Sequence, residues 1–193
     1  MDEVTGIILA GGKSTRMGKD KSFIPVYGRP IIEIVIDKIS SLTSQLLIIT
    51  NKPCLYRKYG IKTKKDILHE HGSLGGIYTS LVFSKTVYNL ITACDMPFIN
   101  MEVARYMIRI MPGYDCVVLR WRRRLEPLFA IYSKHCIRTI EDQLKKKNLK
   151  ISDIFSNLKT KIIMGKEIRR FDPCGRSFVN INTRQDALPF SDS

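Results

Sequence analysis

The chain has 193 residues, of which 44% are hydrophobic and 26% charged, and these values are typical of a globular protein with a sizeable core. They exclude a disordered or fibrous protein, and no apolar run approaches the length of a transmembrane helix. Thirty-two Lys and Arg against 18 Asp and Glu give a net charge of +14, which attracts anions such as nucleotides, phosphorylated metabolites or nucleic acid. An acidic start and five scattered cysteines predict a cytoplasmic protein without a disulfide framework or a structural zinc site.

Strands and helices are predicted to alternate along the chain. The first hundred residues favour, in chain order, a strand at 5–9, a helix at 30–40, a strand at 45–50, a helix from about 75 to 84 and a strand at 90–93. The second half favours a helix after residue 100, strands at 116–119 and 128–132, a helix at 133–147, a strand at 178–181 and a short final helix.

Local signals sharpen some of these boundaries. Asn100 is a typical helix N-cap, and Thr183 with Asp186 resembles the capping box that opens a helix. Pro97 disfavours a helical Met96, so Asp95 is expected just past the end of the 90–93 strand. The alternation of strands and helices predicts one three-layer α/β domain over residues 1–193, with a mostly parallel, Rossmann-like sheet and helices on both faces. Ligands are then expected beyond the carboxyl ends of the strands.

A glycine turn rich in cations follows the first predicted strand. Residues 9–22 read Leu-Ala-Gly-Gly-Lys-Ser-Thr-Arg-Met-Gly-Lys-Asp-Lys-Ser. Glycine lets backbone N–H groups approach a bound group closely, and the neighbouring lysines and arginine supply positive charge, which together suit a polyphosphate. The glycine spacing differs from that of a Walker A loop and of the Gly-x-Gly-x-x-Gly fingerprint. A P-loop NTPase and a nicotinamide dehydrogenase therefore both lose their main support.

Four blocks of sequence point to one family. They are the loop at 9–21, Ala-Cys-Asp-Met-Pro-Phe at 93–98, Glu-Pro-Leu-Phe-Ala-Ile-Tyr at 126–132 and Phe-Val-Asn-Ile-Asn-Thr at 178–183. In this order they resemble the motifs of the molybdenum cofactor guanylyltransferase (MobA) family, whose fold is that of the nucleotide-diphospho-sugar transferases. Enzymes of that family transfer GMP from GTP to the terminal phosphate of the molybdopterin cofactor and release pyrophosphate.

The resemblance implies a role for individual residues. It places Asp95 on Mg²⁺, Lys21 on the nucleotide phosphates and Asn51 near the guanine base, and it makes Lys21, Arg16 and Asp95 the catalytic residues. The remaining nucleotide contacts that it implies are Leu9, Ala10, Gly11, Gly12 and Asp66. The implied partners are GTP, molybdopterin and a molybdoenzyme or cofactor-delivery protein, with neither a membrane nor a nucleic acid among them.

The chemistry of this reaction independently asks for the same residue types. Phosphate attacking phosphate brings anions together, so cations must neutralise the α-phosphate and the departing pyrophosphate. Lys21 and Arg16 fit that task, and Asp95 offers the hard oxygen ligand that Mg²⁺ prefers. Because the attacking phosphate is already ionised, catalysis would consist of positioning and electrostatics.

Several residues keep two interpretations. Asp66 follows two lysines and also fits a surface ion pair, and Asn180 or Asn182 could assist the metal or merely cap a turn. The Arg-Trp-Arg-Arg-Arg stretch at 120–124 could hold an anionic, aromatic pterin or form a solvated hairpin rim. Ser73 and Arg184 stand where the family commonly has proline, which loosens the assignment of the loops around them.

Other functions also remain open. A sibling enzyme that uses CTP on the same acceptor, or a sugar-phosphate nucleotidyltransferase, would share the fold. A basic nucleic-acid-binding module would explain the net charge, but no signature of such a module appears. A nucleotide-binding protein without turnover is disfavoured because Lys21 and Asp95 are both present.

Overall fold

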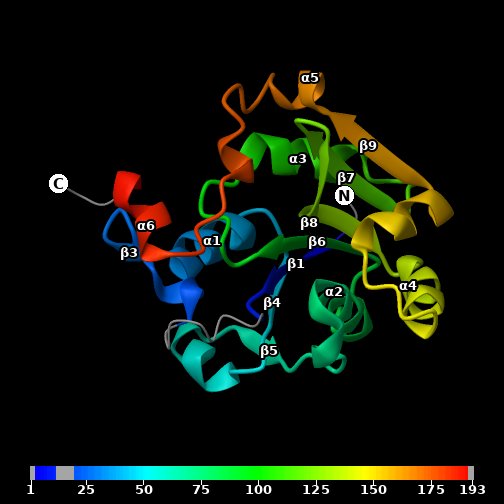
Figure 1. Cartoon of the computed structure of the whole chain (residues 1–193), viewed down its shortest axis with the longest axis horizontal. Coiled ribbons are helices and arrows are strands. Elements are labelled where there is room, and N and C mark those ends of the chain that lie inside the picture. The colour runs from blue at the N-terminus through cyan, green and yellow to red at the C-terminus, as the bar shows by residue number, and fades with distance from the viewer. Residues whose placement is uncertain (1–2, 12–19, 191–193) are drawn as a thin grey trace.

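A computed structural model describes residues 3–11 and 20–190, and its centre is a seven-stranded sheet (Figure 1). Across the sheet the strands stand in the order β5-β4-β1-β6-β8-β7-β9. Their bounds in chain order are β1 Val4–Leu9, β4 Gln45–Ile49, β5 Lys62–Lys64, β6 Tyr88–Ala93, β7 Cys116–Trp121, β8 Arg124–Ser133 and β9 Thr160–Met164. A separate two-stranded ribbon pairs β2 (Pro25–Val26) with β3 (Arg29–Pro30).

All strands of the large sheet except β8 run in one direction. β8 pairs antiparallel with both β6 and β7, so its first residues lie at the edge where the parallel strands end. The register between β7 and β8 shifts between Val118 and Leu119, where β8 carries the extra residues around Pro127. Proline cannot donate a ladder hydrogen bond and is tolerated at such an irregularity. The shift separates the tip of the β7–β8 hairpin from the regular sheet.

Helices cover both faces of the sheet. Their bounds are α1 Ile31–Ser40, α2 Gly72–Phe83, α3 Met101–Ile110, α4 Cys136–Lys145, α5 Gly165–Ile168 and α6 Arg184–Ala187, with 3₁₀ turns η2 Lys21–Phe23, η3 Pro53–Tyr59, η4 His69–His71, η5 Ile151–Asn157, η6 Arg176–Phe178 and η7 Leu188–Phe190. One core cluster joins α1 and α3 to one face, and the second joins α2, α4 and η5 to the other (Figure 1). Side chains alternate between the faces along β1, where Ile8 belongs to the first cluster and Ile7 to the second.

The predicted α/β class, with a mostly parallel sheet covered on both faces, is confirmed. The predicted strand at 178–181 is wrong, because Phe178 ends the short 3₁₀ turn η6 and residues 179–181 continue as irregular chain. Two of its apolar residues pack without any strand pairing: Ile181 is fully buried, and Phe178 stacks on Trp121. β5 and β9, the two edge strands, were not predicted. Within the described residues no helix is both long and apolar enough to cross a membrane.

Candidate active site

The candidate site lies where β1, β4 and β6 end. Leu9 and Ala10 are buried there, and the backbone joins the three strands beyond their last pairs: Ala10 N–H donates to the Ile49 carbonyl at 2.8 Å and Cys94 N–H to the Leu9 carbonyl at 3.1 Å. Asp95 comes just after the end of β6, separated from it by Cys94, as Pro97 predicts. Ligands of α/β proteins bind at this edge of the sheet.

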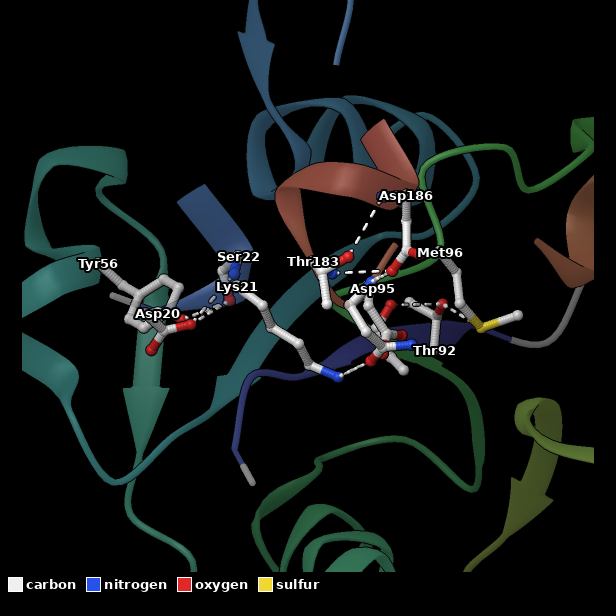
Figure 2. A network of polar contacts seen from close by, with 11 residues as sticks. Asp20, Lys21, Ser22, Tyr56, Thr92, Asp95, Met96, Thr183 and Asp186 are labelled. Atoms are coloured by element: carbon white, nitrogen blue, oxygen red, sulfur yellow. Dashed lines mark hydrogen bonds and ion pairs between the residues drawn. The ribbon is translucent and has the colours of Figure 1, made fainter. Parts of the chain in front are cut away.

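Lys21 is the residue that connects the segments of the site (Figure 2). Its Nζ forms an ion pair with Asp95 Oδ2 and donates a hydrogen bond to Asn182 Oδ1 at 3.0 Å. The two partners come from positions 74 and 161 residues further along the chain. The structure therefore brings together two residues assigned to catalysis, and it settles that Asn182 rather than Asn180 contacts Lys21.

A buried polar network fixes the turn that carries Lys21 (Figure 2). Asp20 caps η2 by accepting hydrogen bonds from Ser22 N–H at 3.1 Å and Ser22 Oγ at 2.8 Å. The Tyr56 hydroxyl donates to Ser22 Oγ at 2.9 Å, and burial raises the pKa of Tyr56 far above its ordinary value. Tyr56 and Ser22 are fully buried, so Lys21 projects from a rigid support. Sequence reasoning did not single out Tyr56 or Ser22, since nothing in their local pattern distinguishes them from core residues.

Asp95 retains one oxygen without a protein partner. Its side chain is only 8% exposed, and Oδ1 is buried with no hydrogen-bond donor among the described residues, while Oδ2 receives Lys21. A buried, unpaired carboxylate oxygen is costly, and a cation would satisfy it. Mg²⁺ commonly takes one or two carboxylates and completes its shell with water and phosphates, so Asp95 fits that ion. In the described part of the chain, no three His, Cys, Asp or Glu side chains gather into a larger metal cluster.

Asp66 holds the loop that leads into α2. Its Oδ1 accepts hydrogen bonds from Leu68 N–H at 2.9 Å and from Thr79 Oγ1 at 2.6 Å. The alternative of a surface ion pair with the preceding lysines is wrong, since Asp66 forms no salt bridge with any described residue. Gly75 permits this arrangement, because a Cβ there would lie 2.4 Å from the Leu68 carbonyl oxygen.

Other residues predicted to contact the nucleotide are exposed or lie outside the described residues. Asn51 follows β4 and is exposed, and Gly11 is exposed after β1. Gly12 and Arg16 lie outside the described residues.

Glu126 is a further acidic residue near Asp95 that sequence reasoning left without a role. It stands at the start of β8, and burial raises its pKa, with the negative charge of Asp95 adding to the shift. Its Oε1 accepts a hydrogen bond from Leu128 N–H at 3.2 Å. Its place in the Glu-Pro-Leu-Phe block was the available signal.

Trp121 has a structural role in this fold. Its ring stacks on Phe178 with centroids 5.1 Å apart and planes 5° apart, and the Arg169 guanidinium lies 5.3 Å from its centroid. Gly175 approaches the other part of the indole so closely that a Cβ would lie 2.3 Å from Trp121 Cζ2. An indole covered in this way is not available for the pterin stacking considered for the 120–124 stretch.

The arrangement can bind and activate phosphates. A fixed ammonium group, a buried carboxylate oxygen open to a cation and a backbone turn after β1 meet at one edge of the sheet. Positioned positive charge of this kind is the main requirement of phosphoryl and nucleotidyl transfer. The adjacent Cys94 is buried, and burial raises the pKa of its thiol to about 12, so it stays protonated and offers no nucleophile.

Comparisons with known proteins agree with this geometry. The family described as "MobA-like NTP transferase domain" matches residues 6–161. A probable molybdenum cofactor guanylyltransferase from Natranaerobius thermophilus is 39% identical over 191 residues, which cover 96% of this chain and 93% of the relative. A molybdenum cofactor guanylyltransferase from Desulfosudis oleivorans is 37% identical over 188 residues, covering 96% and 93%.

A solved structure extends the likeness to three dimensions. The crystal structure of molybdopterin-guanine dinucleotide biosynthesis protein A from Archaeoglobus fulgidus has a TM-score of 0.80 and 26% identity, and the match covers 96% of this chain and 95% of that one. The match confirms the nucleotidyltransferase fold expected from the sequence.

Proposed function

The chain belongs to the MobA-like NTP transferase family, and from that premise we propose that it transfers GMP from GTP to the phosphate of molybdopterin. The observation that carries the proposal is the Lys21–Asp95 pair, held at the carboxyl edge of the sheet with one oxygen of Asp95 left unpaired. The names of the relatives from Natranaerobius thermophilus and Desulfosudis oleivorans support the choice of nucleotide and acceptor.

The reaction forms one phosphoanhydride bond and breaks another. An oxygen of the acceptor phosphate attacks the α-phosphorus of GTP, and the bond to the β-phosphate oxygen breaks, so that pyrophosphate leaves with the electron pair. Lys21 stabilises the negative charge on the phosphates, and Arg16 is proposed to assist it. The acceptor needs no general base because its phosphate is already ionised at neutral pH.

Nucleotidyltransferases of this family generally use a divalent metal, and we propose that Asp95 holds Mg²⁺ here. When bound, the ion would neutralise phosphate oxygens and orient the α-phosphate. The donor set fits, because Asp95 Oδ1 is buried and unpaired within the described structure. Lys21, which also donates to Asn182 Oδ1, holds Oδ2 of the carboxylate in place.

The nucleotide is proposed to lie across the ends of β1 and β4. Leu9, Ala10, Gly11 and Gly12 would contact it through the backbone, and Asn51, which is exposed, is proposed to contact the base. Asp66 would act by shaping the loop before α2, since Thr79 and Leu68 already occupy its Oδ1. A cytoplasmic location, in keeping with five unpaired cysteines, and a delivery or molybdoenzyme partner stay predictions.

The test supplies molybdopterin and Mg²⁺ with GTP, CTP or ATP in parallel and follows the dinucleotide product and pyrophosphate. We expect product with GTP, and a loss of at least about a hundredfold in rate for Asp95→Asn. Asp37→Asn is the matched control, because Asp37 also pairs with a cation, Arg29, but on the exposed surface of α1. Product with CTP alone would move the enzyme to the sibling class, and an Asp95→Asn variant as active as Asp37→Asn would refute the mechanism.

A further inference from the structure

A cavity of about 650 Å³ opens beside the candidate active site, and the reaction proposed above assigns it no ligand. Three separate segments line it: 71–73 at the start of α2, the tip of the β7–β8 hairpin, and 149–152 at the start of η5. The volume lies within the range of small-molecule binding sites, roughly 300–1,000 Å³.

The charge of the cavity is strongly positive. Arg120, Arg123, Arg124 and Lys150 line it, and none of its described lining residues is acidic. Lys150 pairs with Asp153 at 2.9 Å, but the three arginine side chains have no salt bridge or hydrogen bond to any described residue. Arginines that converge without carboxylates form an anion site, with planar donors suited to phosphate oxygens.

Arg120 supplies the most specific sign of a missing ligand. Its Nε is buried and has no hydrogen-bond acceptor in the described structure, and His71 Nδ1, from another cavity-lining residue, is likewise buried without a partner among the described residues. Buried donors are nearly always paired in folded proteins, so the Arg120 Nε–H calls for a partner.

Two arginines occupy the turn of the β7–β8 hairpin with positive φ angles, which are unfavourable for residues with a side chain. Trp121 pairs with Arg124, which leaves Arg122 and Arg123 as a two-residue turn with φ of +44° and +69°. Such turns favour glycine and asparagine, because a side chain crowds the backbone when φ is positive. Strained residues of this kind concentrate at ligand sites, where the side chain has a use that offsets the strain.

Part of the cavity lining is apolar. Leu125 and Ile151 line it, together with Leu149, which is 44% exposed despite its size. A ligand that covers the whole cavity therefore needs both an anionic group and a part that packs against aliphatic side chains. A phosphate alone would leave the apolar wall uncovered.

The cavity borders the candidate active site through β8. Leu125 and Pro127 line the cavity near the start of β8, and β8 pairs with β6, whose end precedes Asp95, so the cavity and Asp95 lie at the same edge of the sheet. A ligand held in the cavity can thus extend one end toward Asp95 and Lys21. The nucleotide is proposed for the opposite side, across β1 and β4, so the two ligands would approach the reacting phosphates from different directions.

We propose that this cavity binds the acceptor, with Arg120 and Arg123 holding anionic groups of the pterin substrate and Leu149 and Ile151 covering its ring system. The inference rests on the proposed function, since it takes molybdopterin as the acceptor. In this proposal the arginines of the β7–β8 hairpin select the acceptor, while Lys21 and Asp95 bind the nucleotide and its metal.

The test compares neighbouring residues of one turn. Arg123→Gly removes a cavity-lining cation and also relieves the positive φ, so the variant should fold at least as stably as the wild type. Arg122→Gly removes the same charge and the same strain from a residue that does not line the cavity. Arg120→Gln supplies a second, independent variant. Binding of molybdopterin is measured anaerobically by its fluorescence without GTP, and KM for molybdopterin and for GTP is measured during turnover.

We expect Arg123→Gly and Arg120→Gln to weaken molybdopterin binding by about tenfold or more, the loss for one charge-assisted hydrogen bond, with KM for GTP unchanged. Arg122→Gly should stay within about twofold of the wild type, as for a solvated surface charge. Equal binding by all three variants would overturn the inference while leaving the proposed function intact. If the wild type binds molybdopterin but transfers no GMP, and Arg123→Gly weakens that binding, the proposed function is refuted while the inference about the cavity stands.

Discussion

Replacing Lys21 by methionine tests how much the Lys21–Asp95 ion pair contributes to the free energy of unfolding. Methionine keeps the length of the side chain and removes the ammonium group. In the variant the Asp95 carboxylate, 8% exposed, loses its only described cation, and Asn182 Oδ1 loses its donor. Both oxygens of Asp95 are then left without a partner among the described residues.

The structure sets the size of the effect. Breaking a buried ion pair from one side costs about 3–5 kcal/mol, because the remaining charge stays buried and unpaired. Lys21 is 21% exposed, so water reaches part of the pair and we expect about 2–4 kcal/mol for Lys21→Met. Asp95→Asn should cost only about 1 kcal/mol, since the lysine it leaves can turn toward solvent and keep Asn182. The double variant should therefore be more stable than Lys21→Met alone.

Urea unfolding in the absence of Mg²⁺, at neutral pH, measures these free energies for the wild type, the two single variants and the double variant. A loss of about 3 kcal/mol corresponds to a fall of roughly 6–12 °C in Tm for a chain of this size. The reasoning is refuted if Lys21→Met unfolds within about 0.5 kcal/mol of the wild type, or if adding Asp95→Asn destabilises it further.

Two other predictions concern β8 and the C-terminal segment. Burial raises the pKa of Glu126, so folding favours its protonated form and this residue costs stability as pH rises through its folded pKa. Glu126→Gln should therefore be more stable than the wild type at about pH 8 and equal to it near pH 4. Urea midpoints of the two proteins that stay parallel across that range would contradict this. Gly175→Ala, at φ +67°, should cost about 2–4 kcal/mol because its Cβ collides with Trp121, and the emission of this single tryptophan should shift. Gly113→Ala, at φ +80° with open space around it, is the control and should cost only about 1 kcal/mol without the shift.

The sequence pattern predicted the elements that carry a periodic apolar signal. The strand at 5–9 and the helix at 30–40 agree with β1 and α1 to within a residue or two, because their buried positions repeat at the expected spacing. β5, Lys62–Lys64, has no such signal, since it is a short, polar edge strand. The apolar residues at 178–181 imitated a strand because Phe178 and Ile181 are held by tertiary contacts rather than by a sheet.

For the site, the sequence supplied residue types and the fold supplied their partners. Asp95 was predicted at a strand end from Pro97, and this was correct. The contact of Lys21 with Asn182 spans 161 residues, and no local pattern could have ranked Asn182 above Asn180. The 120–124 stretch divides for a similar reason: Trp121 faces the C-terminal segment, whereas Arg120 lines the cavity, as alternate residues of one strand do.

The last part of the chain closes the site, and this has a consequence for biosynthesis on the ribosome. The family match ends at residue 161, yet Ile181 N–H donates to the Asp95 carbonyl at 2.9 Å and Asn182 holds Lys21. A nascent chain that has emerged only as far as β9 already contains Lys21, Asp95 and the network of Ser22 and Tyr56, but it lacks the contacts made by Ile181 and Asn182. The proposed metal and nucleotide site is therefore completed only after translation has passed Asn182.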